Sequence, residues 1–133
     1  MILKIAPTGD LEWSRHWGAV SDDPWDQNSS EYAASAAINS QGNLIVVGSQ
    51  LEHGQPASPF VVSYDPDGNA LDTFHYEFAG EEAGFAGIAV SESGRVFFCG
   101  DAIYSNTSDY RTFVGELDST FEIAWQRHWT GID

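Results

Sequence analysis

Two stretches of the sequence decide the fold: residues 32–49, YAASAAINSQGNLIVVGS, and residues 85–101, FAGIAVSESGRVFFCGD. They align when Gly42 is placed on Gly94, at an offset of 52 residues, and the segments that follow them align as well. A period of about 50 residues is typical of propellers and other proteins built from one repeated supersecondary unit. The sequence therefore predicts two copies of such a unit.

The rest of the unit supports this alignment. Residues 59–65, PFVVSYD, align with residues 112–118, TFVGELD, at an offset of 53. A third match opens the chain, because residues 13–17, WSRHW, recur 112 residues later as residues 125–129, WQRHW. Within a single domain, residues 1–133, we expect an extra outer strand, a first unit and a second unit at residues 9–18, 31–78 and 84–129.

Each unit is interpreted as four short strands in two hairpins. Residues 44–47 and 96–99 are continuous apolar runs, which are typical of strands buried on both faces, and each run ends at a glycine. Residues 31–38 carry four alanines and alone favour a helix, but the aligned residues 84–90 contain two glycines and β-branched residues that disfavour one. We therefore expect an all-β chain with two four-stranded antiparallel sheets and one extra N-terminal strand.

A sequence pattern links these strands to a known family. A Ser-x-Gly-Asn turn precedes an apolar strand, an Asp-x-x-Gly turn follows the next strand, and the last strand carries a tryptophan. The matching residues are Ser40, Gly42, Asn43, Val46, Gly48, Phe60, Val61, Tyr64, Asp65, Gly68 and Trp125. In this pattern the chain resembles the bacterial β-propeller repeats often called SBBP or Delta-60-like repeats. The second unit departs from it, with Arg95 in place of Asn43 and Cys99 in place of Val47. The resemblance implies propeller-like blades and no particular activity.

The chain is too short for a closed propeller, which has about 4 to 8 blades. Sheet faces lined by Phe97, Ile45 and Val62 would then form an exposed apolar patch. A ring of three or four chains, further blades in a longer protein, or a compact sandwich of the two units would each cover these faces. We expect a homo-oligomer, with the extra strand donated to a neighbouring chain.

Composition and charge exclude several classes of partner. The 133 residues include 20 acidic and 5 basic side chains, which give a net charge of -15. Because binding a polyanion requires Lys and Arg, we expect neither nucleic acid nor an anionic membrane as a partner. Nothing at the N-terminus resembles a signal peptide, and no stretch approaches the ~20 apolar residues of a membrane span. The compartment stays open.

The loop at residues 21–30 is the predicted ligand-binding site. It contains a tryptophan that nothing in the repeat requires, together with three aspartates. An indole can stack on a sugar ring while carboxylates bind its hydroxyl groups, so the ligand is expected to be a carbohydrate or a protein. The predicted residues are Trp25, Asp22, Asp23 and Asp26. The paired tryptophans of residues 13–17 and 125–129 are expected to pack between blades, with a sugar platform as the alternative.

Oxygen ligands are clustered at Asp65, Asp67 and Asn69, followed by Asp72. Calcium prefers such ligands, but the same residues form an ordinary hairpin turn, which is the favoured interpretation. A weak Ca²⁺ site is the alternative, and no other cofactor is expected. The repeated position of His16 and His128 favours a structural role for both histidines.

No catalytic constellation is found in the sequence. Cys99 lies in an apolar run and is expected to be buried, and Glu81 and Glu82 are expected at a solvated corner of the loop at residues 79–84. The sequence therefore predicts a non-enzymatic binding or scaffolding module that self-associates into a ring. The alternative is a glycan-binding lectin-like protein, or a hydrolase that uses acidic loop residues and tryptophans.

Overall fold

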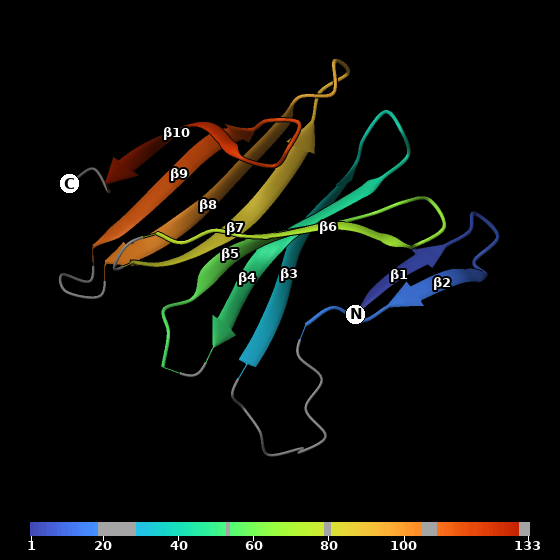
Figure 1. Ribbon diagram of the computed structural model, residues 1–133, viewed down its shortest axis with the longest axis horizontal. Helices are drawn as coiled ribbons and strands as arrows, with labels where there is room; N and C mark the ends of the chain where they lie inside the picture. Colours follow the sequence, from blue (N-terminus) through green and yellow to red (C-terminus); the bar gives the residue numbers. More distant parts are fainter. Residues whose placement is uncertain (19–28, 53, 79–80, 105–108, 131–133) are drawn as a thin grey trace.

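The computed structural model describes residues 1–18, 29–52, 54–78, 81–104 and 109–130 (Figure 1). These residues form strands and turns, and none of them belongs to a helix that could cross a bilayer. The strands are β1 (Ile2–Ile5), β2 (Leu11–Arg15), β3 (Ser29–Ile38), β4 (Leu44–Glu52), β5 (Ser58–Tyr64), β6 (Ala70–His75), β7 (Glu81–Val90), β8 (Val96–Tyr104), β9 (Tyr110–Leu117) and β10 (Ile123–Thr130).

The predicted all-β fold with two four-stranded antiparallel sheets is confirmed. Strands β3 to β6 form the first sheet and strands β7 to β10 form the second, and in each sheet every strand pairs with its neighbour in the chain. The alanine-rich residues 31–38 lie in strand β3, as the aligned residues of β7 indicated.

The N-terminal element is a hairpin of β1 and β2, whereas a single strand at residues 9–18 was expected. The additional strand forms because Ile2 and Lys4 alternate with Leu3 and Ile5, a period of two residues that suits a strand covered on one face. A tight turn then reverses the chain, with Gly9 at φ 92° donating its N–H to the carbonyl of Ala6 over 2.8 Å. We call β1 and β2 the N-terminal hairpin.

Five described turns share one geometry, and the three at Gly9, Gly68 and Phe121 also adjoin an irregularity in strand pairing. Gly68 donates to the carbonyl of Asp65 over 3.0 Å, and Phe121 donates to the carbonyl of Asp118 over 3.1 Å, as Gly9 does in the N-terminal hairpin. In each of these three turns the donating residue has a positive φ: 92° at Gly9, 81° at Gly68 and 60° at Phe121. The register of strand pairing shifts next to each of these three turns, at Ile5, at Tyr64 and at Leu117. These three residues therefore occupy corresponding positions in their hairpins.

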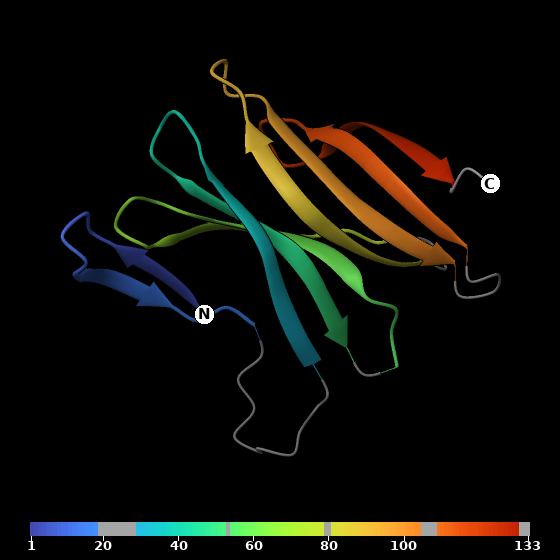
Figure 2. The same cartoon turned by 180° about the vertical axis from the view of Figure 1, so that it is seen from behind.

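The chain is arranged in three layers. In Figure 1 and Figure 2 the N-terminal hairpin and the second sheet lie on opposite sides of the first sheet. Side chains of the first sheet point alternately to the two sides, so Ile45 and Val47 pack against the second sheet while Phe60 and Val62 pack under the hairpin. Ile45 and Val62, which were expected on uncovered faces, are therefore buried.

Most of the core lies between the two sheets. Phe85, Phe98 and Phe113 of the second sheet form an aromatic cluster, with ring centroids 4.8 to 6.1 Å apart, over Val47 and Val61 of the first. Burying a phenylalanine side chain contributes roughly 1.5 to 3 kcal/mol to folding. The first sheet is thus the central layer, and apolar side chains cover both of its faces.

Two glycines expected at strand ends lie inside strands. Strand β4 continues past Gly48 and β8 continues past Gly100, each for four more residues. Each glycine faces the place where the preceding strand has an extra residue, between Ala33 and Ser35 or between Phe85 and Gly87. A Cβ there would overlap a backbone carbonyl of the bulged strand, so these positions require glycine for space and not for a turn.

Candidate functional site

One face of the second sheet has no covering layer among the described residues. Its buried residues, such as Phe98, alternate along β8 with residues that point away from the first sheet, and no described strand lies on that side in Figure 1 or Figure 2. We call this surface the open face. Its residues are Phe97, Cys99, Asp101 and Ile103 of β8, Val114 and Glu116 of β9, and Trp125, Arg127 and Trp129 of β10.

Aromatic side chains on the open face are accessible. Trp125 is 39% exposed and Trp129 is 52% exposed. Cys99 is exposed as well, so the expectation of a buried thiol was wrong. Its neighbours in β8 made the run look buried on both faces, but the described residues cover only one of those faces. The open face therefore combines large apolar groups with access to solvent, which is unusual for a monomeric protein surface.

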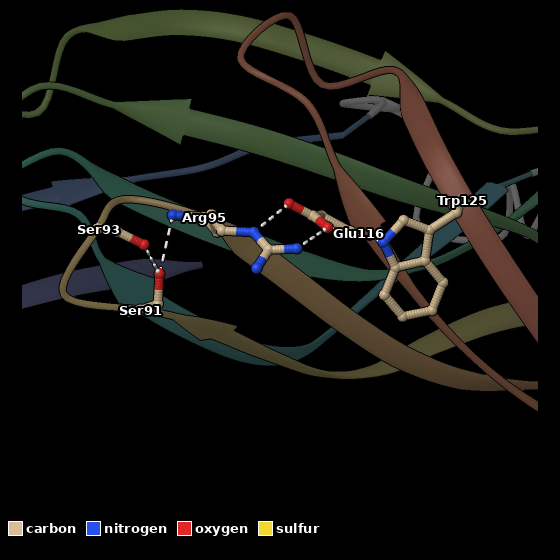
Figure 3. A network of polar contacts seen from close by, with 5 residues as sticks. All are labelled: Ser91, Ser93, Arg95, Glu116 and Trp125. Carbon is tan, nitrogen blue, oxygen red and sulfur yellow. Dashed lines mark hydrogen bonds and ion pairs between the residues drawn. The ribbon is translucent and has the colours of Figure 1, made fainter.

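A polar network at one edge of the open face holds Trp125 in place (Figure 3). The Arg95 guanidinium donates two hydrogen bonds to the Glu116 carboxylate, over 2.7 and 2.6 Å, and the Trp125 indole Nε1 donates to the same carboxylate over 2.7 Å. The hydrogen bond from Arg95 is the largest cause that lowers the pKa of Glu116. Figure 3 also shows Ser91, whose hydroxyl accepts a hydrogen bond from the Arg95 backbone N–H over 3.0 Å.

The corresponding tryptophans of the N-terminal hairpin are packed on the first sheet. The Trp17 ring lies 4.1 Å from the Phe60 ring and 5.7 Å from the His75 ring, measured between centroids. Trp13 donates from Nε1 to the carbonyl of Pro66 over 3.0 Å. Trp17 corresponds to Trp129 in the match between residues 13–17 and 125–129. The position that is accessible at Trp129 is thus covered at Trp17.

In the first sheet the corresponding position is held by Tyr76, which is covered between the two sheets. Tyr76, just after β6, packs edge-on against Phe85 at 5.2 Å and donates its hydroxyl hydrogen to the carbonyl of Phe121 over 2.6 Å. Burial, and then the charge of Asp118, raises the pKa of Tyr76 above its usual value. The series Trp17, Tyr76 and Trp129 therefore contains two packed aromatic residues and one accessible one.

The N-terminal hairpin also has an uncovered side. Ile2, Trp13 and Arg15 face the first sheet, whereas Leu3, Ile5 and Leu11 are about half exposed. The stack of three layers thus ends in an apolar surface on both sides.

The predicted ligand-binding residues Trp25, Asp22, Asp23 and Asp26 lie outside the described residues, so their prediction is untested. The predicted oxygen cluster is described. The carboxylate of Asp65 accepts hydrogen bonds from the backbone N–H groups of Asp67 and Asn69 and from the Asn69 side chain, over 2.8 to 2.9 Å. Among the described residues no group of three or more His, Cys, Asp or Glu side chains is arranged to hold a metal ion. The geometry is that of a hairpin turn, and the Ca²⁺ alternative stays a prediction.

Acidification should weaken this turn. The hydrogen bond from the Asn69 side chain is the main cause that lowers the pKa of Asp65. A lowered pKa in the folded state stabilises the fold above the unfolded pKa, near 3.9, and this contribution is lost as the pH falls through the folded value. We expect Asp65→Asn to be less stable than the wild type at pH 7, with a difference that narrows below about pH 4. Thermal unfolding between pH 2 and 7 measures this, and Asp67→Asn is the matched control from the same turn. A difference that does not vary with pH would contradict the role of the charge.

Glu81 and Glu82 were expected at a loop corner, but they are the first two residues of β7. Because side chains alternate along a strand, Glu81 is buried and Glu82 is exposed, and the two do not form a catalytic pair. His128 lies 5.9 Å from the Phe113 ring centroid and 6.4 Å from that of Phe78, which fits the expected structural role.

Comparison with protein-family models and with curated protein sequences finds no match for this chain. The sequence contained a signal for the missed strand β1, because residues 6–10, APTGD, have the proline and glycine spacing of residues 65–69, DPDGN. The network of Arg95 and Glu116 had no such signal, since it depends on the pairing of β8 with β9.

Proposed function

We propose that this chain is a non-enzymatic, propeller-type scaffolding module that self-associates into a ring through its open face. One observation carries the proposal: the aromatic position that is packed at Trp17 and Tyr76 is accessible at Trp129. Trp17 and Tyr76 each pack on the next layer of the chain. A further layer on the open face would continue the same packing.

The hairpin of a second copy is the occupant that fits. Met1, Leu3 and Ile5 hold the positions that Phe60, Val62 and Tyr64 hold in the first sheet, as judged from the corresponding turns and strand pairing. All three side chains are apolar and exposed. Trp129 of one copy would then pack on Met1 and Leu3 of the next, as Trp17 packs on Phe60.

The layers of the chain favour a ring of two copies over the three or four expected from the sequence. Each chain supplies three layers, because the N-terminal hairpin occupies the place of one blade. Two copies supply six layers, within the range of about 4 to 8 blades in propellers, whereas three copies exceed it. Such a head-to-tail contact is heterologous, so further copies add until the ring closes.

The charge of the chain should make this association depend on salt. Two copies with a net charge of -15 each repel one another, and added salt screens that repulsion. An interface of apolar side chains therefore predicts tighter association at higher salt. Weaker association with rising salt would indicate an interface of ion pairs instead.

The mass in solution tests the proposal. Light scattering is expected to give about twice the chain mass of 14.5 kDa for the wild type and a single chain mass for Trp129→Ala. Loss of a central interface tryptophan typically raises the dissociation constant about 30-fold or more. Tyr32→Ala, which removes an exposed aromatic side chain from β3, is the control and should leave the mass unchanged. A wild type that stays at one chain mass at every concentration would overturn the proposal.

Glycan recognition is the second candidate. It rests on two accessible indoles on one face, Trp125 and Trp129, and on the predicted site at Trp25. A glycan array with the wild type and Trp25→Ala, combined with a panel of glycoside hydrolase assays, separates a lectin from a hydrolase and both from a scaffold.

A further inference from the structure

Trp13 and Arg15 of β2 bind the turn at residues 65–69 of the first sheet. The Arg15 guanidinium donates from Nε to the carbonyl of Gly68, and from Nη2 to that of Asp67 over 3.3 Å. The Trp13 ring covers Gly68, because a Cβ added to Gly68 would lie only 2.7 Å from it. A tryptophan and an arginine two residues apart thus fit a turn that has glycine as its donating residue.

The contact between the two sheets has different side chains at the corresponding positions. Asp72 and Phe74 of β6 replace the tryptophan and the arginine of β2, and Phe121 replaces the glycine of the turn. The Phe74 ring lies 5.5 Å from the Phe121 ring, measured between centroids. Because Asp72 is smaller than a tryptophan, the turn below it has room for a phenylalanine. The residue types of the contacting strand and of the turn therefore change together.

Each end of the stack of layers carries one half of such a contact (Figure 1). Trp125 and Arg127 of β10 repeat the tryptophan and the arginine of β2 on the open face. Arg127 is exposed, and no described residue forms a hydrogen bond or an ion pair with it. The turn at residues 6–10 repeats the glycine turn of the first sheet, and Gly9 is exposed with no described atom within 4 Å of an added Cβ. The uncovered strand and the uncovered turn are therefore of the matching kind.

The turn at residues 6–10 has unused hydrogen-bond acceptors. The Gly9 N–H donates to the carbonyl of Ala6, whereas the carbonyls of Thr8 and Gly9 accept no hydrogen bond from the part of the chain that the structure describes. These two carbonyls hold the places of the two that Arg15 binds in the first sheet. The chain thus has an unused guanidinium at one end of the stack and its acceptors at the other.

We propose that Arg127 and Trp125 determine which surface the open face binds, by recognising the glycine turn at residues 6–10 of a second copy. Arg127 donates to the carbonyls of Thr8 and Gly9, and the Trp125 ring covers Gly9. Glu116, which accepts from the Trp125 indole over 2.7 Å, keeps that ring on the open face. This inference rests on the proposed ring and adds the specificity of its contact. A turn with a side chain in place of glycine is rejected, because the tryptophan occupies the space.

Gly9→Phe tests the proposal, with light scattering over a dilution series at about 500 mM salt to screen the repulsion between copies. The added ring would meet Trp125 of the next copy, so the dissociation constant should rise about 30-fold or more. The turn itself can carry the substitution, because Phe121 adopts a φ of 60° at the corresponding position. Gly54→Phe is the control. Gly54 has a φ of 77° and open space around an added Cβ, and it lies outside both surfaces, so this variant should associate like the wild type.

A compensating variant separates recognition from a general loss of packing. Trp125→Ala with Arg127→Phe should also weaken association about 30-fold or more. Adding Gly9→Phe to that pair restores the two facing phenylalanines seen at Phe74 and Phe121, and it should bring the dissociation constant back to within about tenfold of the wild type.

Arg127→Lys keeps the proposal falsifiable if Gly9→Phe fails to fold. It leaves the net charge unchanged but replaces the planar fork that reaches two carbonyls, so the dissociation constant should rise about threefold or more. A wild type that stays at one chain mass would overturn the ring and this inference together. A ring that Gly9→Phe or Arg127→Lys leaves as tight as the wild type, or a triple variant no tighter than Gly9→Phe alone, would overturn this inference and leave the ring standing.

Discussion

Trp17→Ala is expected to lower the free energy of unfolding by about 2 to 4 kcal/mol and to release the N-terminal hairpin from the first sheet. Trp17 lies 4.1 Å from Phe60 and is packed with Val62 and Tyr64 in one cluster. Its removal leaves a cavity over that cluster, and only part of the surrounding structure can relax to fill it. The hairpin would then be held only by Ile2, by the Trp13 ring near Tyr64, and by polar contacts such as those of Trp13 and Lys4 with the Pro66 carbonyl.

Urea unfolding measures this effect, and it should be done in the Trp129→Ala background so that association does not add to the apparent stability. Trp129→Ala itself, compared with the wild type at concentrations where both are single chains, should change stability by less than about 0.5 kcal/mol, because Trp129 supports no layer among the described residues. Hydrogen exchange at the amides of β1 and β2 should accelerate in the Trp17 variant. Unchanged exchange there, or equal losses from the two tryptophans, would contradict the layered arrangement.

Gly100→Ala is expected to cost about 3 kcal/mol or more, although Ala is an ordinary residue in strands. A Cβ at this position would overlap the Gly84 carbonyl oxygen and contact the Phe113 ring, and neither can move without disturbing the pairing of β7 with β8. The same reasoning applies to Gly48, whose Cβ would overlap the carbonyl of Tyr32.

Gly94→Ala is the matched control for this substitution. Gly94 has a φ of 82° and no atom within 4 Å of an added Cβ, so the variant pays only for backbone conformation, about 1 kcal/mol. Thermal or urea unfolding of both variants compares the two causes. A smaller loss for Gly100→Ala than for Gly94→Ala would mean that the bulge in β7 relaxes, and the spatial role assigned to Gly100 would be wrong.

The strands of this protein could be predicted because the signals for them are local. Turn glycines, apolar runs and the match between two halves of the chain located β4, β5, β8 and β9. The assignment of residues 31–38 to a strand depended on its aligned partner, which shows how a second copy can overrule a misleading local composition.

Which strand faces are covered and which are exposed could not be predicted to the same extent, because this depends on how the layers stack. Ile45 and Cys99 lie in similar apolar runs, yet Ile45 is covered by the second sheet and Cys99 is exposed. Glu81 was placed in a loop because two adjacent acidic residues near glycines are typical of a corner, whereas the first residues of β7 continue the sheet. Both differences concern tertiary contacts that no local pattern records.

Every strand in the two sheets pairs only with its neighbour in the chain, and each sheet is a complete meander. No described strand crosses from one layer into another, so a layer can be inserted without cutting an existing hydrogen-bonded pair. Duplication of a gene segment of 52 residues would therefore lengthen the stack by one sheet while its ends stayed the same. Such an architecture can change its number of layers through a single genetic event.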